Sequence, residues 1–532
     1  MKINASIEIN EQFQRALYLM DNTDQCLFIT GKAGTGKSTL LSHYCASTRK
    51  KPVVLAPTGV AALNVKGQTI HNFFNFYVDV TPQKIREKKT KPRGDKTRLY
   101  KKLKSIIIDE VSMVRADLLD CIDIFLRMYG PVPDAPFGGV QMIFVGDLYQ
   151  LPPVVTGQER EIFSTHYKTP FFFSAHIMEN FPLEIVELEK VYRQKDQHFV
   201  DLLNCIRNNS VEEADIERLN SRFMPDTGAV AENARDGFFI SLTTTNKKAD
   251  EINDEKLQSL NGKLHVSQAQ ITGDFGKEYF PTAIELQFRV GAQIMLLNND
   301  SRKRWVNGSI GVIEAYKLDE DGERYVEVVL QDSDEGAVRV YLYTWEVYRF
   351  TLEEGAIVSE PAGSFIQYPF RLAWAITIHK SQGKTFDHVM IDIGGGTFVA
   401  GQMYVALSRC TSFEGILLKT RIKKQHIRTD YRIFSFLTGY QYRKAELELS
   451  LEDKVALIQR AIREKAAMNM VYLKANDTKS VREILPRQVG PQTYKGKEFT
   501  GMTAFCLQRQ EDRTFRVDRI LKLEIADIAL NY

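Results

Sequence analysis

The sequence predicts an α/β fold in which strands and helices alternate to build parallel sheets, with smaller β-rich parts added. Three observations support this prediction. The N-terminal region alternates short apolar runs with helical segments, which is the pattern of a parallel sheet. One such run, "CLFIT" at 26–30, is followed directly by a glycine-rich loop and a helical segment. Residues 262–350 change to short strands separated by turns.

Length and composition restrict the class of protein. A chain of 532 residues allows about two to four domains. Hydrophobic residues at 44% and charged residues at 26% are typical of a globular protein in water. No apolar run approaches the roughly 20 residues that cross a bilayer, and the first residues lack a secretion signal. We therefore expect a cytoplasmic protein (bacterial cytosol or nucleoid) without membrane contact. The six scattered cysteines argue against a disulfide framework and a zinc site.

The first chemical motif is a phosphate-binding loop. "GKAGTGKS" at 31–38 matches G-x-x-x-x-G-K-[ST] between a strand and a helix. Its glycines let backbone N–H groups turn toward phosphate oxygens, and the helix N-terminus adds positive partial charge. Lys37 can reach the β- and γ-phosphates, and Ser38 can ligate Mg²⁺. The predicted nucleotide-binding residues are Gly31, Gly34, Thr35, Gly36, Lys37, Ser38 and Thr39.

A second stretch, "TIHKSQGKTF" at 377–386, ends like a phosphate loop but fails the same test. The first glycine of the motif would stand at position 378, where the sequence has Ile378. A second nucleotide site is therefore not expected. The dense polar side chains leave two alternatives, contact with another polyanion or a polar surface turn.

Carboxylates and a glutamine follow two further apolar strands. "KSIIIDEVSMV" at 104–114 places Asp109 to hold Mg²⁺ and Glu110 to orient and deprotonate the attacking water. "QMIFVGDLYQLPPV" at 141–154 places Gln150 near the γ-phosphate or the water, with a solvated loop glutamine as the alternative.

Hydrolysis by such a site needs cations from across an interface between two domains. Arg193 in "LEKVYRQ" and Arg409 in "YVALSRC" are the candidates, because an arginine near the γ-phosphate stabilises charge that develops in the transition state. A structural ion pair is the alternative for each.

The order of these segments carries a resemblance to a known family. "LAPTGVAALNVKGQTIHNFF", "IIIDEVSMV", "VGDLYQLPPV", "LEKVYRQKDQHFVDLLNCIR", "AITIHKSQGKTFD" and "YVALSRC" together closely resemble the Pif-type (petite-integration-frequency) DNA helicases of superfamily one. The resemblance spans about residues 8–435. It implies two RecA-like motor domains that use ATP and Mg²⁺ to move 5′ to 3′ along single-stranded DNA and unwind duplexes at junctions. A monomer is expected, with a transient dimer on DNA left open.

The resemblance also implies roles for individual residues. Gln14 would read the adenine, with Gln12 as the alternative register. Aromatic side chains at 73, 74 and 76 could stack on bases, although core packing is favoured for at least two of them. Residues expected along the DNA strand are Thr58, Gly59, His71, Asn72 and Phe73 in the first motor domain, and Thr377, His379, Lys380, Ser381 and Gln382 in the second.

Two insertions are expected in the motor. Residues 84–104 hold eleven Lys or Arg against two acids, and the family carries a strand-splitting wedge subdomain here, over about 75–104. Residues 262–350 resemble the family's Src-homology-3-like β-barrel, in which Asn307 and Gly308 match a "VNG" motif. A solvated basic face and a simple tight turn are the alternatives.

The C-terminal segment resembles the WYL domains of bacterial regulators, a helix with a small Sm-like β-barrel. "SLEDKVALIQRAIREKA" at 450–466 begins with a Ser-x-x-Asp capping signal. The Trp-Tyr-Leu tripeptide itself is absent, and "FTG" stands near its place. Arginines here could bind single-stranded DNA or could be ion-paired. They are Arg482, Arg487, Arg509, Arg516 and Arg519, of which Arg516 and Arg519 are the chosen DNA contacts.

The expected domains are a first motor domain at 1–175, a second at 176–436, a linker at 437–449 and a WYL-like domain at 450–532. Two other functions stay open. One is a RecD-like subunit of an exonuclease complex, against which the signature at 188–207 counts. The other is an ATP-gated DNA-binding switch whose C-terminal domain reads a ligand or regulates the motor.

Overall fold

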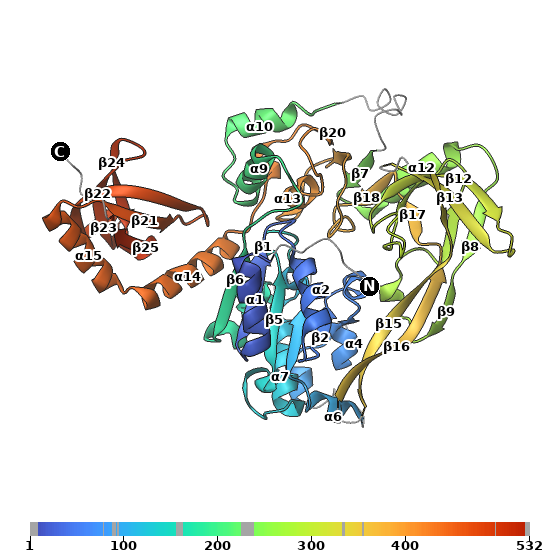
Figure 1. Cartoon of the computed structure of the whole chain (residues 1–532), viewed down its shortest axis with the longest axis horizontal. Coiled ribbons are helices and arrows are strands. Elements are labelled where there is room, and N and C mark those ends of the chain that lie inside the picture. The colour runs from blue at the N-terminus through green and yellow to red at the C-terminus, as the bar shows by residue number, and fades with distance from the viewer. Residues whose placement is uncertain are drawn as a thin grey trace. The chain divides into compact units, whose positions relative to one another are not determined.

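The computed structural model of the chain describes residues 9–77, 79–87, 92, 95–155, 163–224, 239–331, 336–353, 356–494 and 496–526. Contacts divide the chain into two compact units (Figure 1). The N-terminal unit holds the residues up to 206 and those from 211 to 428, and the C-terminal unit holds 207–210 and 429–532. No helix in the described part of the chain is long and apolar enough to cross a membrane.

A six-stranded parallel sheet forms the core of the first motor domain. Its strand order is β3-β2-β4-β5-β1-β6. The central strands are buried at almost every position, as expected for a parallel sheet covered by helices on both faces. The strands are β1 (Cys26–Gly31), β2 (Val53–Ala56), β3 (Gln68–Thr69), β4 (Ser105–Ile108), β5 (Gln141–Gly146) and β6 (Leu183–Leu188). The helices are α1 (Glu11–Asn22), α2 (Lys37–Ser47), α3 (Gly59–Asn64), α4 (Ile70–Phe74) and α7 (Ala116–Tyr129).

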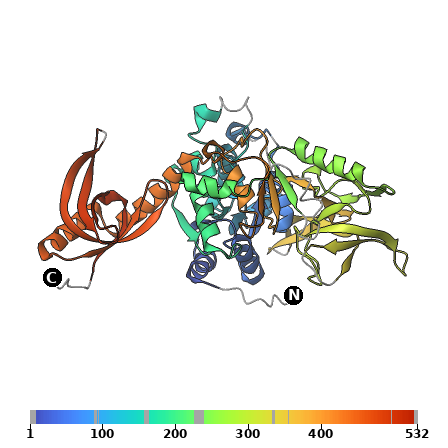
Figure 2. The ribbon, with the colours of Figure 1, turned by 90° about the horizontal axis from the view of Figure 1, so that it is seen from above.

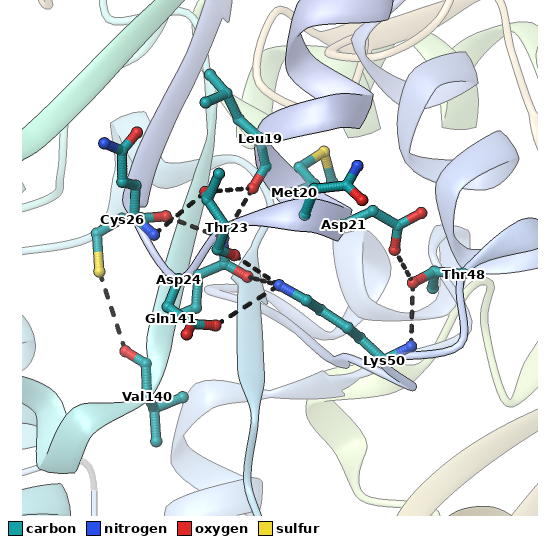
Figure 3. Close-up of polar contacts among 12 residues, drawn as sticks. Leu19, Met20, Asp21, Thr23, Asp24, Cys26, Thr48, Lys50, Val140 and Gln141 are labelled. Atoms are coloured by element: carbon teal, nitrogen blue, oxygen red, sulfur yellow. Dashed lines mark hydrogen bonds and ion pairs between the residues drawn. The ribbon is translucent and has the colours of Figure 1, made fainter.

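A polar network ties helix α1 to this sheet at the end opposite the phosphate loop (Figure 3). The Lys50 ammonium donates to the Thr23 carbonyl at 2.6 Å and to Gln141 Oε1 at 3.0 Å. The Gln141 amide donates to the carbonyls of Leu19 and Gln25 at 3.2 and 2.9 Å. Because three segments share one amine and one amide, the end of α1 is fixed against β1 and β5.

The second motor domain has a smaller parallel sheet, in the order β18-β7-β19-β20. Strand β6, at 183–188, pairs in parallel with β1 and therefore belongs to the first sheet. The expected boundary at 175 is wrong for this reason. The strands of the second sheet are β7 (Ile240–Thr243), β18 (Ala375–Thr377), β19 (Val389–Asp392) and β20 (Ile416–Leu418). The helices of this domain include α9 (Gln197–Arg207), α10 (Glu213–Asn220), α12 (Asn246–Ser259) and α13 (Gln402–Leu407).

The β-rich insertion is present but ends later than the predicted residue 350. A five-stranded antiparallel sheet, β14-β13-β12-β11-β17, includes β17 (Phe370–Leu372), and a long hairpin reaches residue 367. Its core contains Phe288, Trp305 and Phe370. The other strands are β8 (His265–Gln268), β9 (Gln270–Gly273), β10 (Glu285–Phe288), β11 (Gln293–Leu296), β12 (Ile310–Leu318), β13 (Arg324–Leu330), β14 (Ala337–Val340), β15 (Tyr343–Glu353) and β16 (Ala356–Gln367).

The basic segment expected as a wedge forms two short helices, α5 (Pro82–Arg86) and α6 (Asp95–Tyr100). Residues 88–91, 93 and 94 lie outside the described residues. Tyr100 is fully buried and donates its hydroxyl to the Phe73 carbonyl at 2.7 Å. Helix α6 is therefore anchored to the core beside α4.

The C-terminal unit consists of two helices and a five-stranded antiparallel sheet, β24-β23-β22-β21-β25. Ser450 caps α15 by accepting from the Asp453 N–H at 3.1 Å, which confirms the capping signal. The expected linker at 437–449 is wrong, because α14 continues through it. Figure 2 shows β22 and β23 (red) as a long hairpin. The elements are α14 (Tyr431–Glu448), α15 (Leu451–Glu464), β21 (Met468–Leu473), β22 (Lys479–Tyr494), β23 (Lys497–Cys506), β24 (Glu511–Arg516) and β25 (Ile520–Ile525).

Candidate functional site

The loop between β1 and α2 has the shape of a phosphate cradle. Gly34 and Gly36 adopt φ angles of 79° and 87°, which side chains with a Cβ avoid. A Cβ on Gly31 would lie 2.6 Å from Thr35 Oγ1 and 2.7 Å from the Leu188 carbonyl. The glycines are thus required by both backbone conformation and close packing.

The polar side chains of this loop are placed where a triphosphate and Mg²⁺ would bind. The Lys37 ammonium donates to the carbonyls of Gly31 and Lys32 at 2.7 and 3.0 Å, so it lies across the loop. Ser38 and Thr39 are exposed at the start of α2. Gln14 is exposed on α1, one residue after the buried Phe13, and Gln12 is half-buried.

Two carboxylates lie at the end of β4, as the sequence predicts. Burial raises the pKa of Asp109, and Lys37 acts in the opposite direction. Burial, and then the neighbouring Asp109 carboxylate, raise the pKa of Glu110 to about 7. Glu110 also has a φ of 50°, which turns the chain sharply after the strand. A carboxylate with this pKa is suited to accept a proton near neutral pH.

Gln150 connects the first motor domain to the second. Its amide donates to Asp147 Oδ2 at 3.2 Å, and its Oε1 accepts from the Gln382 amide at 3.2 Å. The same Gln382 amide makes a longer contact of 3.5 Å with Glu110 Oε2. The glutamine is therefore held in a network, and the alternative of a solvated loop side chain does not describe it.

Two arginines of the second motor domain lie at the same interface. The Arg193 guanidinium donates to the Ser408 carbonyl at 3.0 Å. Arg409 is 1% exposed and donates to the carbonyls of Val405 and Lys384 at 2.9 and 3.2 Å. Burial, and then Arg193, lower the pKa of Arg409 to about 9, and Glu110 acts in the opposite direction. A half-buried cation beside a fully buried one favours an anionic group between them.

Of the residues in the loop 377–386 that were predicted to contact DNA, some are buried and stabilise the loop, and others are exposed. Thr377 and Ser381 are buried; Thr377 Oγ1 accepts from the Lys380 N–H at 3.3 Å, and Ser381 Oγ donates to the Ile378 carbonyl at 2.7 Å. His379 and Lys380 are exposed. The described residues 384–388, which follow Gly383 directly, form no helix, in agreement with the prediction that this is not a second phosphate loop.

The predicted DNA residues of the first motor domain have different exposure. Thr58 and Asn72 are exposed and His71 is half-buried. Gly59 is buried, with the backbone of Glu278 directly over it. Phe73 is only 2% exposed.

The expectation that Phe73 stacks on a base does not agree with this structure. Its ring packs edge-on against Phe74, Tyr100 and Phe350 at centroid distances of 4.9, 5.5 and 6.0 Å. Phe74 and Phe76 are 0% and 7% exposed. All three phenylalanines therefore follow the core-packing alternative.

Most arginines of the C-terminal unit have partners within it. Arg516 pairs with Asp518 at 2.7 Å and lies over the Phe499 ring at 5.1 Å. Arg487 pairs with Asp512 at 2.9 Å. Arg482 is 7% exposed, Arg509 is exposed and Arg519 is half-buried. The sheet thus presents fewer free cations than the sequence suggested, and the DNA contacts by Arg516 and Arg519 stay a prediction.

The residues present fit a magnesium–nucleotide complex. No group of three or more His, Cys, Asp or Glu able to hold a metal occurs in the described part of the chain. Ser38 at the start of α2 and Asp109 at the end of β4 are the two side-chain oxygens that would hold the ion. Mg²⁺ commonly takes few protein ligands and completes its shell with phosphate oxygens and water. The donor set therefore matches Mg²⁺ bound with a nucleotide.

Sequence reasoning missed Tyr404, which precedes "VALSRC" in α13. Its hydroxyl accepts from the Ala33 N–H at 2.9 Å, and the side chain is 4% exposed. A second contact joins the Tyr192 N–H to the Gly34 carbonyl at 2.8 Å. The only available signal was the position of Tyr404 five residues before Arg409. These bonds fix the phosphate loop against the second motor domain.

Comparisons with known proteins agree with this geometry. The family model described as PIF1-like helicase matches residues 8–217, and the one described as WYL domain matches residues 453–525. Among curated proteins, the chain is 34% identical over 398 residues to the ATP-dependent DNA helicase PIF1 of Danio rerio, covering 73% of this chain and 58% of that protein. It is 30% identical over 406 residues to the ATP-dependent DNA helicase Pif1 of Campylobacter jejuni, covering 73% and 87%.

Among solved structures, the Pif1 protein of a Bacteroides species has a TM-score of 0.74 at 38% identity, covering 81% of this chain and 97% of that one. The chain thus spans 58% of the zebrafish relative but most of the bacterial ones. The phosphate loop, the paired carboxylates and Arg193 lie within residues 8–217, which the PIF1-like helicase model matches. The chain belongs to the PIF1-like helicase family, and its C-terminal unit carries a WYL domain.

Proposed function

We propose that this chain is an ATP-dependent DNA helicase that moves 5′ to 3′ on single-stranded DNA and unwinds duplexes. One observation carries the proposal: Gln382, on the loop expected to hold DNA, is bonded to Gln150 and contacts Glu110. The grip on the strand and the hydrolysis of ATP would thus share one polar network. Solved structures support this, since those of Bacteroides Pif1 include complexes with ADP-AlF4 and with single-stranded DNA. A further structure concerns the unwinding of forked duplex DNA by Pif1 helicases.

Hydrolysis would use the residues at the interface of the two motor domains. Lys37 would exchange its bonds to the Gly31 and Lys32 carbonyls for phosphate oxygens. Glu110 would take the proton of the attacking water, while Arg193 and Arg409 stabilise charge that develops on the γ-phosphate. Magnesium, held by Ser38 and Asp109, would supply positive charge on the phosphate oxygens when bound.

Movement along DNA would follow from closing and opening of the two domains. Loss of the γ-phosphate removes the anion that Arg193 and Arg409 share, which favours separation. Because Arg409 donates to the Lys384 carbonyl and Gln382 donates to Gln150, separation also shifts the loop 377–386. Alternating affinity of this loop for DNA phosphates, with Thr58 and Asn72 holding the strand on the other domain, would give directed steps.

The C-terminal unit would act as a regulatory or single-stranded-DNA-binding module. Arg516 lies over the Phe499 ring in this unit, and a cation beside a ring suits single strands, because phosphates meet cations and bases stack on rings. We also propose a bacterial cytosolic or nucleoid location. A monomer would be the basic form, with a transient dimer on DNA; one similar solved structure concerns two coordinating Pif1 helicases at forked duplex DNA.

A strand-displacement assay tests the proposal. Duplexes with a 5′ or a 3′ single-stranded tail are mixed with the full chain and ATP, and release of the labelled strand is followed. Displacement should require the 5′ tail and should be abolished by Lys37→Ala. ATP hydrolysis on DNA without strand release would instead favour the ATP-gated switch.

A further inference from the structure

Two cations come close together where the loop 377–386 meets the β-rich insertion. Lys384 follows Gly383 on the loop, and Arg371 lies on β17. The Lys384 ammonium donates to Asn307 Oδ1 at 2.6 Å. Asn307 stands in the turn before β12, and its N–H donates to Asn299 Oδ1 at 2.8 Å. Both the lysine and the asparagine are therefore held in place by the insertion.

The close approach depends on Gly308. This residue has a φ of 107°, and a Cβ built on it would lie 3.6 Å from the Lys384 Cβ. The "VNG" motif is thus a tight turn, in agreement with the alternative that it has a structural role. Its conformation also brings an amide oxygen onto the ammonium group. The turn therefore positions Asn307 Oδ1 against Lys384 in addition to reversing the chain.

Neither cation has an acid as its partner among the described residues. One Arg371 guanidinium N–H donates to the Pro281 carbonyl, but its Nε–H is buried and meets no acceptor in the described part of the chain. The group that acts electrostatically on Lys384 is Arg371, which has the same charge. Both side chains are half-buried, and the Arg371 Nε–H is fully buried. Buried charges in folded proteins are nearly always paired. Two half-buried cations without an acid, one of them with a buried donor that meets no acceptor, indicate a place for an anion.

We propose that Lys384, Arg371 and Asn307 form a pocket for one internucleotide phosphate of the bound DNA strand. The proposal rests on the DNA-binding function proposed above and adds to it a contact at the insertion. A phosphodiester offers two charged oxygens, which match the free ammonium N–H groups of Lys384 and the Nε–H of Arg371. The exposed His379 and Lys380 lie on the same loop, so the strand would continue past them.

The protonation of Lys384 supports this assignment. Burial, and then Arg371, lower the pKa of Lys384 to about 7. Burial also lowers the pKa of the neighbouring His379 and Lys380; Arg371 adds to the effect on Lys380, and Asp250 opposes it. A phosphate that binds here favours the charged amine and raises its pKa. Binding above pH 7 would therefore be accompanied by proton uptake.

This pocket would also connect DNA to the nucleotide site. The Lys384 carbonyl accepts from Arg409 at 3.2 Å, and the Phe386 N–H donates to the Arg409 carbonyl at 2.9 Å. A strand phosphate that holds the Lys384 side chain would thus restrain the backbone on which Arg409 depends.

The first test measures binding of the full-length protein to a fluorescent oligo-dT by anisotropy at several salt concentrations. Lys384→Met should weaken binding about tenfold or more. It should also reduce the slope of log K against log salt by about 0.7, the value for one single-strand phosphate. Lys256→Met, which removes an exposed lysine of α12, is the matched control and should reproduce the wild type.

The second test varies pH from 7 to 9 at constant ionic strength. Above pH 7 the free wild-type protein loses the Lys384 proton, so its affinity should fall by up to about tenfold per pH unit. Lys384→Arg keeps a charge that does not titrate and should bind with little pH dependence. The lowered pKa of His379 places its titration below this range. A retained pH slope in Lys384→Arg would refute the pocket.

The outcomes separate this inference from the proposed function. If the wild type does not bind oligo-dT at all, the proposed function fails. If the wild type binds and Lys384→Met binds equally well with the same salt slope, only the pocket is refuted. Inorganic phosphate is tested against chloride at equal ionic strength. Phosphate binding that is lost in Lys384→Met, together with an oligo-dT affinity that is unchanged in that variant, would show that the pocket binds a free anion. This result would overturn the proposal that it binds a phosphate of the DNA strand.

Discussion

The Gln382 side-chain amide donates a hydrogen bond of 3.2 Å to Gln150 Oε1, although the two residues are 232 positions apart in the chain. Gln382 lies on the loop after β18, and Gln150 lies on the loop after β5. The bond joins the carboxyl ends of strands from two different sheets. In the proposed helicase, it would therefore be a direct route by which DNA bound on one domain influences hydrolysis on the other.

Gln382→Ala should lower the stimulation of ATP hydrolysis by DNA, because it removes this route. We expect the ratio of DNA-stimulated to DNA-independent kcat to fall about tenfold. Steady-state ATPase rates with and without oligo-dT measure the ratio. A double variant, Gln382→Ala with Gln150→Ala, should have the same ratio as Gln150→Ala alone, since the effects of substitutions within one network are not additive. Additive losses would show that the two glutamines act separately.

Glu110→Gln should lower kcat about 100-fold or more while nucleotide binding is kept, because it removes the base but preserves the shape of the side chain. In the wild type, kcat/KM should fall as the pH drops below about 7, since the raised pKa of Glu110 leaves the base protonated there. A pH–rate profile checks the second expectation. An unchanged acid limb in a variant with residual activity would assign the titration to another group.

Arg193→Ala should lower kcat about 1,000-fold, in the range seen when an arginine that stabilises the transition state is lost. The affinity for ATP should change far less, because the contact is strongest in the transition state. Single-turnover hydrolysis and nucleotide-binding titrations separate these quantities. Arg302→Ala, at an exposed position of the insertion, is the control. Equal losses of kcat and nucleotide affinity would indicate ground-state binding.

A chain that ends at residue 428 should remain folded and active, whereas one that ends at 437 should expose apolar surface. Helix α14 belongs to the C-terminal unit, and its Tyr442 hydroxyl donates to the Leu473 carbonyl at 3.0 Å. Ending at 437 keeps Phe434 and Leu437, which are 9% and 6% exposed in the full chain, but removes the rest of α14, helix α15 and the sheet of the C-terminal unit. Dye binding to exposed apolar surface and thermal unfolding compare the two. Equal behaviour would mean that α14 folds independently of the unit.

Much of the site could be predicted because its signals are local. Gly31 to Ser38 and the pair Asp109–Glu110 are short segments whose strand, loop and helix can be read from neighbouring residues. Their placement in the structure agrees with that prediction. The coarse β-rich character of the insertion was also local, since it rests on alternating strands and turns.

The rest depends on contacts between distant segments. The strand at 183–188 looks like the start of a new domain until its pairing with β1 is seen. Phe73 looks like a base-stacking residue until Tyr100 and Phe350 enclose it. The segment 437–449 has no strong apolar stripe, so its continuation as helix is decided by packing within the C-terminal unit. The roles of Tyr404 and Lys384 could not be predicted, because their partners Ala33 and Asn307 are distant in the sequence.

The hydrogen bond from the Ala33 N–H to the Tyr404 hydroxyl affects how easily the two motor domains separate. If the two motor domains separate, the buried Ala33 N–H must exchange the Tyr404 hydroxyl for water or lose its acceptor. Such a change costs on the order of 1 kcal/mol. This bond therefore opposes the separation that the two neighbouring arginines favour when no anion lies between them. The balance between closed and open domains would then depend on a small difference, which a bound nucleotide can shift.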